Sequence, residues 1–277
     1  MTQRNSTDVR GEGGGAPSAA RKILIVYAHP EPRSLNGALK DFAVDALRAT
    51  GHAVEVSDLY AMGWKAVADG GDFLERDRHE RLHYGRESRR AHDGGSQSAD
   101  IVAEQAKILR ADALVLQFPL WWFAPPAILK GWIDRVFANG FAYGVGAYEG
   151  ARYGLRYGEG RLAGKRALVS TTSGGLPPHY SDRGVHGAID DLLFPLTHGT
   201  LYYAGIDTLQ PFVVHGANRL DDAGFDAAAH AYRARLAHLF TEAPIAFRMQ
   251  NGGDYDADLR LRPDLEGESA GLAIHRR

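Results

Sequence analysis

A short apolar run, a rigid aromatic loop and an amphipathic segment follow one another near the middle of this chain. Residues 112–117 are apolar and too few for a helix, so they predict a buried strand. Prolines stiffen the loop over 118–125, and Pro126 suits the first turn of a helix, where a missing N–H costs nothing. Residues 126–137 carry apolar side chains at helical spacing. This unit predicts an α/β protein whose ligand binds where the strand ends.

The same alternation of strands and helices recurs along the whole chain. Short apolar or alternating runs predict strands over residues 22–28, 53–58, 112–117, 166–171 and 202–208, with 212–214 extending the edge. Helical spacing predicts helices over residues 36–49, 101–110, 126–137, 185–197 and 223–241. This order is typical of a parallel, doubly wound sheet, and five strands favour the flavodoxin-like order 2-1-3-4-5.

Composition also divides the chain into segments. Residues 1–20 are polar and Gly-rich and bury too little apolar surface to order, so we expect them to be disordered. Residues 21–245 should form one flavodoxin-like domain, with residues 60–99 as a charged, Gly-rich surface insertion. Residues 246–277 have mixed polarity and should wrap the surface as a C-terminal tail.

Charge and residue usage exclude several classes of function. The formal net charge of −2 gives no reason to expect nucleic acid or an anionic membrane as a partner. The absence of cysteine excludes disulfides, thiolate zinc sites and cysteine nucleophiles. No run approaches the length of a membrane span, and the first residues lack the apolar core of a signal peptide. We therefore expect a cytoplasmic protein.

Three loops should converge on one crevice, because they leave the carboxyl ends of neighbouring strands. The first loop, with His29, Ser34 and Asn36, precedes a helix N-terminus, whose free N–H groups suit a phosphate. The alternative is that Ser34 and Asn36 only cap the helix. The chain lacks Gly-x-Gly-x-x-Gly after the first strand and lacks a P-loop, which disfavours those nucleotide sites.

The second loop supplies the aromatic side chains of Trp121, Trp122 and Phe123. These could be ordinary core residues, but three in a row on a loop cannot all point inward. At least one should therefore face a ligand or a partner, and a flat ligand fits such a surface.

The third loop, over residues 171–180, supplies hydroxyls and glycines. Gly174 and Gly175 let the backbone approach a planar ligand and present N–H donors, as the pyrimidine edge of a reducible flavin needs. Tyr180 and His186 follow and could share a proton as charge moves. Structural hydrogen bonding is the alternative role for each.

One competing motif lies in the insertion. His79 to His83 reads His-Glu-x-x-His, which on a helix would place two zinc ligands on one face. A third ligand is not evident, although His92 is a candidate, and catalytic zinc usually takes three protein ligands. We therefore favour a solvated charged segment and expect no metal.

At the level of whole motifs, the chain resembles the NAD(P)H:quinone oxidoreductases of the DT-diaphorase type, within the flavodoxin-like flavoproteins. The resemblance covers about residues 21–245. The most specific stretch is 117–132, and the others are 23–29 with 34–36, 57–62, 100–105, 172–175 with Tyr180, and 184–187.

The resemblance implies non-covalent FAD, with FMN as the alternative, NAD(P)H as co-substrate and a homodimer whose sites lie at the subunit interface. It implies two-electron reduction of quinones, with both substrates using one place in turn. The implied FAD contacts are His29, Ser34, Leu35 and Asn36 at the phosphates, Pro119, Leu120, Trp121, Trp122 and Phe123 along the isoalloxazine, and Thr172, Gly174 and Gly175 at its polar edge. Tyr180 and His186 match the catalytic pair, and Tyr143 and Tyr203 match pocket-lining aromatics from the partner subunit.

The chain departs from the family pattern at several positions. Val145 stands where mammalian members have a second lid tyrosine, and Trp121 replaces a polar residue beside the flavin. Pro177 and Pro178 stiffen the loop that carries Tyr180. Two other functions are consistent with the same fold: an azo- or nitro-compound reductase, and an electron carrier that passes single electrons to a protein.

Overall fold

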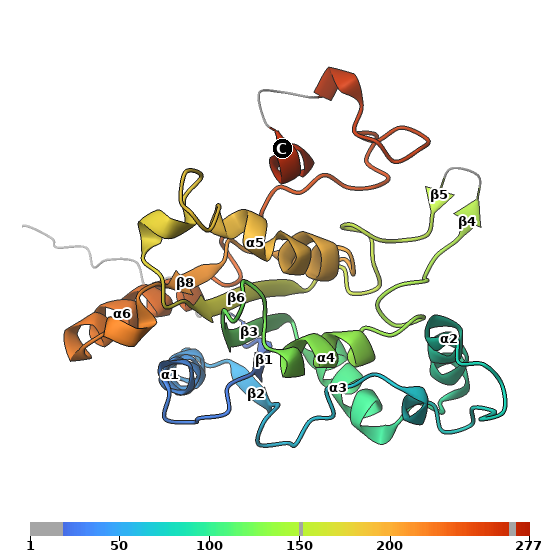
Figure 1. The fold of residues 1–277 in the computed structure, drawn as a ribbon, viewed down its shortest axis with the longest axis horizontal. Coiled ribbons are helices and arrows are strands. Elements are labelled where there is room, and N and C mark those ends of the chain that lie inside the picture. The colour runs from blue at the N-terminus through green and yellow to red at the C-terminus, as the bar shows by residue number, and fades with distance from the viewer. Residues whose placement is uncertain (1–18, 150–151, 266–269) are drawn as a thin grey trace, which may run out of the picture.

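A five-position parallel sheet forms the centre of the computed structural model, which describes residues 19–149, 152–265 and 270–277 (Figure 1). The strands lie in the order β2-β1-β3-β6-β7. Strand β7 pairs with the first residues of β6, and β8 pairs with the last residues of the same strand. Their bounds are β1 Lys22–Tyr27, β2 Ala53–Asp58, β3 Ala113–Pro119, β6 Arg166–Thr172, β7 Asp207–Thr208 and β8 Phe212–Val214. The predicted order 2-1-3-4-5 is therefore confirmed.

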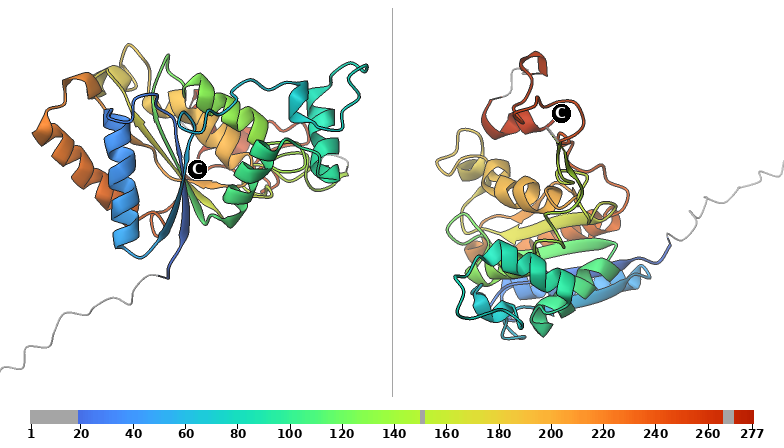
Figure 2. Two further views of the ribbon diagram at one scale, coloured as in Figure 1. Left: turned by 90° about the horizontal axis from the view of Figure 1, so that it is seen from below. Right: turned by 90° about the vertical axis from the view of Figure 1, so that its right-hand side faces the viewer.

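Helices cover both faces of this sheet (Figure 2). Helices α1 (Leu35–Ala49) and α6 (Asp222–Ala237) contribute to one core, and α3 (Ala99–Arg110), α4 (Ala127–Val136) and α5 (Ile189–Leu196) contribute to the other. A further helix, α2 (Tyr84–Gly94), lies near α4, where Asn139 N donates to Ser88 Oγ at 3.1 Å. The layers are those of a doubly wound fold.

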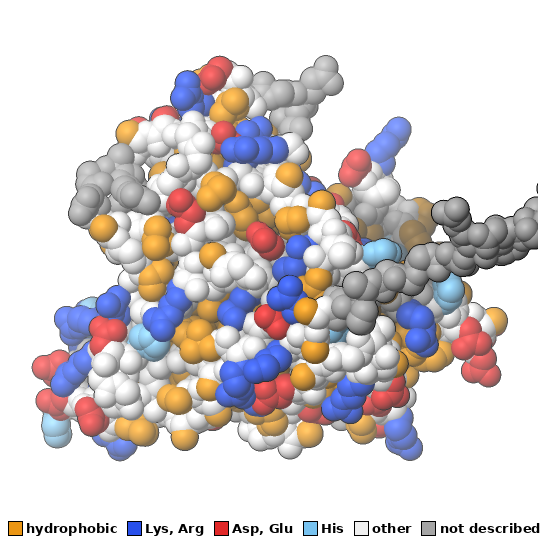
Figure 3. Space-filling view, turned by 180° about the vertical axis from the view of Figure 1, so that it is seen from behind, with side chains coloured by type: hydrophobic (Ala, Val, Ile, Leu, Met, Phe, Trp, Pro, Cys, Tyr) orange, Lys and Arg blue, Asp and Glu red, His pale blue; other side chains and the backbone are white. Residues whose placement is uncertain are grey.

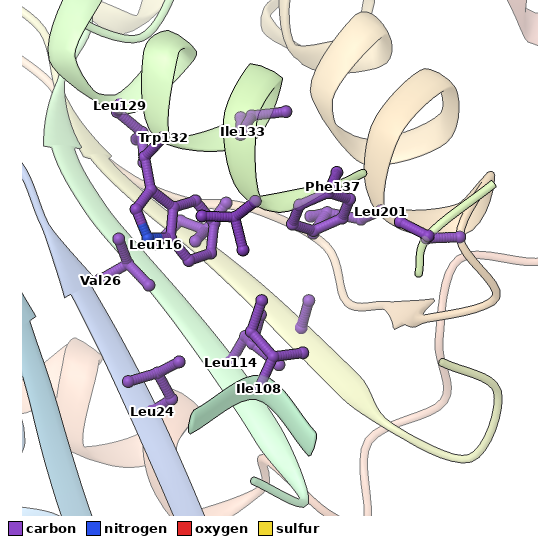
Figure 4. Close-up of a cluster of buried hydrophobic side chains, with 14 of the residues drawn as sticks. Leu24, Val26, Ile108, Leu114, Leu116, Leu129, Trp132, Ile133, Phe137 and Leu201 are labelled. Carbon is purple, nitrogen blue, oxygen red and sulfur yellow. The ribbon is translucent and has the colours of Figure 1, made fainter. Parts of the chain in front are cut away.

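The two cores explain why the strands read as continuous apolar runs. Leu24 and Val26 point toward α4, as Figure 4 shows, while Ile23 and Ile25 point toward α1. Strand β3 alternates in the same way, because successive side chains of a strand face opposite sides. The indole of Trp132 on α4 fills the centre of the first core and is fully buried.

The fifth strand position differs from its prediction. Tyr202 ends a π-helix, Thr197–Tyr202, instead of starting a strand, and two short segments, β7 and β8, share the edge. Gly205 turns the chain between the π-helix and β7 with φ of +97°, and a Cβ there would lie 2.7 Å from Gly160 N. The predicted helix over 185–197 begins later, at Ile189, because Gly187 has φ of +78° in the preceding loop.

The segment over 60–99 contains more regular structure than its polar sequence suggested. It holds the short 3-10 helix Gly70–Asp72 and the helix α2, which the sequence analysis did not predict. His79 lies in a turn and His83 is the N-cap of α2, so they do not share a helical face. Within the described residues no cluster of three His, Cys, Asp or Glu side chains could hold a metal ion, and the expectation of no metal stays a prediction.

Several other expectations concern the ends and surface of the molecule. Residues 1–18 lie outside the described residues, so their predicted disorder stays a prediction.

The C-terminal segment lies beside α5, where Arg276 Nη1 and Asp190 Oδ2 are 2.9 Å apart. No helix of the described residues is long and apolar enough to cross a membrane, and a cytoplasmic location stays a prediction. Basic and acidic side chains are interspersed over the face in Figure 3.

A buried ion-pair network joins the 60–99 segment to α4. Arg135 on α4 is 1% exposed at its side chain and lies 2.9 Å from Asp72 and 2.7 Å from Asp100. Lys65 contacts the same Asp72 carboxylate at 2.9 Å, and the Tyr84 hydroxyl donates to it at 2.8 Å. These partners hold the pKa of Asp72 below its usual value although burial alone would raise it. The network therefore links α2 to α4 through Asp72.

Removing the buried cation should destabilise the fold strongly. Arg135→Met leaves the buried Asp72 carboxylate without its main partner, and we expect the free energy of unfolding to fall by about 3 kcal/mol in urea. The control is Arg110→Met, which breaks an exposed pair with Glu55 and should cost at most about 1 kcal/mol. Equal losses in the two variants would show that the network does not anchor this segment.

Candidate functional site

A chain of buried hydrogen bonds ties the carboxyl-terminal parts of β3 and β6 to the start of α1, which follows β1. Gln117 at the end of β3 donates from Nε2 to Asn36 Oδ1 at 2.9 Å, and Asn36 Nδ2 donates to Thr172 Oγ1 at 2.8 Å. The hydroxyl of Tyr232 on α6 donates to Gln117 Oε1 at 3.3 Å. The loops after β1, β3 and β6 therefore keep a fixed mutual position, as the strand order predicted. Gln117 is a functional residue that the sequence analysis missed; its signal was an amide within an apolar strand.

The first loop ends at the N-terminus of α1. Ser34 is the N-cap, and its Oγ accepts from Gly37 N at 3.1 Å, so its capping role is confirmed. A Cβ at Gly37 would lie 1.9 Å from the Pro32 carbonyl oxygen, so the loop folds tightly over the helix start. The N–H groups of Leu35 and Asn36 have no partner within a helix by its geometry, and they are available to an anion.

The Asn36 side chain is buried inside the protein and is therefore not placed to contact a phosphate. It is 3% exposed and its amide is used by Gln117 and Thr172. Its contribution to a cofactor is therefore limited to its backbone N–H. The ring of His29, in contrast, lies at the mouth of the loop, with its centroid 5.9 Å from that of Trp121.

The second loop contains a strained aromatic turn. Trp121 and Ala124 exchange backbone hydrogen bonds of 3.0 and 3.1 Å, and the two residues between them have positive φ, 48° at Trp122 and 61° at Phe123. Turns with this backbone favour glycine and asparagine, and each bulky residue here costs about 1–3 kcal/mol. Trp122 is 94% exposed, so the core alternative is wrong for it. Strain together with exposure is typical of a surface that binds a ligand.

The third loop packs directly against the second. Leu120 N donates to the Thr172 carbonyl at 2.8 Å, and Pro119 pairs with Thr172 at the ends of β3 and β6. A Cβ at Gly175 would lie 2.8 Å from Tyr180 Cε2, so glycine is required there for the tyrosine to lie on the loop. Gly174 is exposed, which leaves its backbone accessible, although an added Cβ would lie 3.2 Å from Asn218 Nδ2.

Tyr180 and His186 lie together, as predicted. Their ring centroids are 4.9 Å apart, and the His186 ring is 5.2 Å from that of Phe123 on the second loop. Tyr180 is 9% exposed, yet its hydroxyl makes no hydrogen bond to any described residue. Although the residue is largely buried, its hydroxyl oxygen is reached by solvent and is therefore accessible to a ligand. The catalytic role of the pair stays a prediction.

A second histidine, which the sequence analysis missed, lies on the other side of Tyr180. The His215 ring is 5.2 Å from that of Tyr180, and its Nδ1 lies 3.0 Å from Ser173 Oγ. Burial lowers the pKa of His215, so it is neutral near neutral pH. No sequence signal placed it there, because it follows β8, 42 residues beyond Ser173.

Tyr143 and Tyr203 line a separate cavity of about 340 Å³. Its other lining residues include Tyr84, and none of them belongs to the three loops. Burial raises the pKa of Tyr143, and burial with the neighbouring Asp72 raises that of Tyr84. The structure therefore brings the two predicted pocket tyrosines together but keeps them apart from the aromatic turn of the same chain.

The residues of the three loops fit a flavin. They combine an exposed flat aromatic turn, an accessible glycine backbone, the accessible Tyr180 hydroxyl and a helix N-terminus that suits a phosphate. This set matches the chemistry of a planar, phosphate-bearing cofactor whose ring gains charge on reduction.

Comparison with known proteins agrees with this arrangement. The family model of flavodoxin-like fold matches residues 21–236. A ribosyldihydronicotinamide dehydrogenase-like protein from Penicillium crustosum is 46% identical over 92% of this chain and 96% of its own length. The NAD(P)H dehydrogenase [quinone] 1 of Cavia porcellus is 37% identical over 91% of this chain and 90% of its own. The chain belongs to this quinone dehydrogenase family of flavodoxin-like fold.

A solved structure supports the same family. A protein from Klebsiella pneumoniae, assigned provisionally as a quinone reductase, is 51% identical, with a TM-score of 0.91 over 93% of this chain and 100% of that one. The family resemblance seen in the sequence motifs is therefore confirmed, and the protein is an oxidoreductase of this quinone dehydrogenase family.

Relieving the strain in the aromatic turn should stabilise the protein. Trp122→Asn with Phe123→Gly places residues that accept positive φ, so we expect the flavin-free protein to gain about 1–3 kcal/mol in thermal unfolding and to bind flavin more weakly. Trp122→Phe keeps the strain and should leave stability unchanged. A lower unfolding midpoint for the double variant would contradict the strain argument.

Proposed function

We propose that this protein is an FAD-dependent NAD(P)H:quinone oxidoreductase. The observation that carries the proposal is the convergence of three strand-end loops on an exposed, strained aromatic turn next to the unpartnered Tyr180 hydroxyl. The names of the related dehydrogenases support the reaction type and the quinone as acceptor.

The chain's own residues would bind and orient the cofactor. The N–H groups at the start of α1, with Ser34 and His29 close by, would hold its phosphates. Pro119, Leu120 and the turn residues Trp121 to Phe123 would line its ring, and Thr172, Gly174 and Gly175 would face the polar edge. A bound flavin accepts a hydride from NAD(P)H and delivers it to a quinone. Tyr180 and His186 would hold or release a proton beside that edge.

The cofactor proposal is tested by the colour of the purified protein. We expect a flavin absorption spectrum, and release of the chromophore should give FAD at about one equivalent per chain. Release of FMN would favour an azo- or nitro-reductase. Turnover of quinone, azo and nitro substrates, measured side by side, would distinguish the three reductase activities. A colourless protein that takes up no added flavin would overturn the proposal. An electron carrier would reduce a protein partner without quinone turnover.

The position of the two pocket tyrosines supports a homodimer. Tyr143 and Tyr203 line a cavity that contains no residue of the three loops, so a second copy of the chain would bring such aromatics to the aromatic turn. Because both substrates would then share one enclosed place, we expect ping-pong kinetics. Intersecting double-reciprocal plots, which indicate a ternary complex, would contradict the proposal that both substrates use one site in turn.

The dimer proposal can be tested by placing a charge in this cavity. Tyr203→Arg should give a monomer by light scattering and lower quinone turnover at least about tenfold, because a buried charge is costly at an apolar interface. Val102→Arg on the exposed side of α3 is the control and should remain dimeric and active. A monomeric wild-type enzyme with full turnover would rule out the shared site.

The proton role of Tyr180 and His186 predicts a kinetic defect. Tyr180→Phe with His186→Gln should slow flavin reduction by NAD(P)H roughly a hundredfold in stopped flow, because one proton partner contributes at least that factor. His179→Gln, on the same loop, should reduce flavin at the wild-type rate. Wild-type speed in the double variant would remove the pair from the mechanism.

A further inference from the structure

A cavity of about 630 Å³ is bounded by the start of α5 and the C-terminal segment. Residues 187–191, which lead into α5, form one wall, and Ala270, Ala273 and Arg276 form the other. The C-terminal segment lies beside α5 in Figure 1. The described lining includes no residue of the aromatic turn, so this space is additional to the surface proposed for the flavin ring. Its volume is within the range of small-molecule sites.

Tyr180 connects this cavity to the predicted catalytic pair. It lines the cavity, and its ring centroid lies 4.9 Å from that of His186. The residue is 9% exposed, and its hydroxyl has no hydrogen-bond partner in the described part of the chain. The hydroxyl oxygen is open to solvent, so it can bond to a molecule in the cavity. A ligand that enters here therefore meets the tyrosine that is proposed to hold or release a proton.

One of the three aspartates in the lining is compensated inside the protein. Asp190 Oδ2 lies 2.9 Å from Arg276 Nη1, and this ion pair joins the C-terminal segment to α5. Gln210 Nε2 donates to both carboxylate oxygens of Asp190, at 2.8 and 2.9 Å. The guanidinium and the carboxylate cancel each other, so this pair shapes the wall of the cavity without adding a net charge to it.

The other two aspartates are not compensated. Asp182 lies two residues beyond Tyr180, and Asp191 lies in the first turn of α5. Both are exposed and line the cavity, and among the described residues neither carboxylate makes an ion pair or a hydrogen bond. Arg183 follows Asp182 in the chain but is not part of the lining. With three aspartates and one arginine, the lining carries a formal charge of −2.

An anionic lining next to an aromatic ring favours an organic cation. Carboxylates attract positive charge, and the attraction is stronger where walls of protein replace part of the screening water. The face of the Tyr180 ring can add a cation–π contact. The N-terminus of α5 offsets part of the charge of Asp191, but Asp182 lies outside the helix and keeps its full charge. Ile189 and Ala273 offer apolar surface to the carbon atoms of such a cation.

We propose that this cavity binds the positively charged end of the electron acceptor, so that the enzyme prefers quinones with a cationic substituent over anionic quinones of the same ring. The inference rests on the proposed function and adds the charge of its substrate. The ring of the acceptor would stay beside Tyr180, and the cationic group would lie near Asp182 and Asp191. The two carboxylates take no part in hydride transfer and act on binding alone.

The kinetic test compares two menadione derivatives that differ only at the end of a short chain on the quinone ring, which is a trimethylammonium group or a sulfonate. The cation-to-anion ratio of kcat/KM should be at least about tenfold higher in the wild type than in Asp182→Asn with Asp191→Asn, because two charges are lost at constant side-chain size. The change should lie in KM, since the charge acts on binding. The matched control is Asp45→Asn with Asp226→Asn on the exposed surfaces of α1 and α6, which should keep the wild-type ratio.

A binding experiment tests the same charge preference without turnover. Calorimetric titration of the full-length protein, with the cofactor that it retains, uses the redox-inactive pair 2-naphthylmethyl-trimethylammonium and 2-naphthylmethanesulfonate. The wild type should bind the cation at least about tenfold more tightly than the anion, and the double variant should lose this preference. Salt at about 0.5 M should weaken the wild-type preference, because it screens the carboxylates.

Three results would overturn the proposal. They are the same cation-to-anion ratio in the wild type and the double cavity variant, tighter binding of the anion by the wild type, and an equal loss of preference in the control, which would assign the effect to the net charge of the whole protein. If the double variant does not fold, Asp182→Asn alone decides the outcome. A protein without flavin or quinone turnover would remove the proposed function, and the calorimetric pair would then decide the charge preference of the cavity.

Discussion

The hydrogen bonds from Gln117 to Asn36 and from Asn36 to Thr172 are the interaction on which the site depends. They join the ends of β3 and β6 to the start of α1, through partners that are 81 and 136 residues apart in sequence. Each amide uses its oxygen and its nitrogen inside the protein, so loss of one would leave the others unsatisfied in a buried position. Because they link residues at or beside all three loops, the loops can be irregular and strained without losing their relative positions. The stable sheet thus supports an active crevice that has little regular structure.

The aromatic turn shows what this support makes possible. Trp122 and Phe123 hold positive φ angles that the local sequence disfavours, and the surrounding bonds at Trp121, Ala124 and Leu120 keep them in place. A flat, exposed surface results, with His29 on one side and His186 on the other. Its rigidity lowers the ordering cost of binding a planar ligand.

Much of the fold could be predicted because apolar periodicity is a local signal. The alternation of Leu24 and Ile25 between two cores and the helical spacing over Ala127–Val136 follow directly from side-chain geometry. Helix α2 was missed because its polar residues carry no such spacing, and it is held instead by tertiary contacts such as the hydrogen bond from Tyr84 to Asp72, which pairs with Arg135. The fifth strand was misplaced because Pro195 and Gly205 allow a π-helix and a turn where apolar content suggested a strand.

The sequence by itself determined the order of the main strands, the family, and the three loops that follow β1, β3 and β6, since motifs and periodicity are properties of neighbouring residues. Only the tertiary structure decided that the Asn36 side chain is internal, that Tyr143 and Tyr203 lie away from the aromatic turn of their own chain, and that His215 approaches Tyr180. It also decided that His198 is buried and neutral. Burial, backbone strain and the pKa of a side chain depend on contacts between segments far apart in sequence, and no local pattern encodes those contacts.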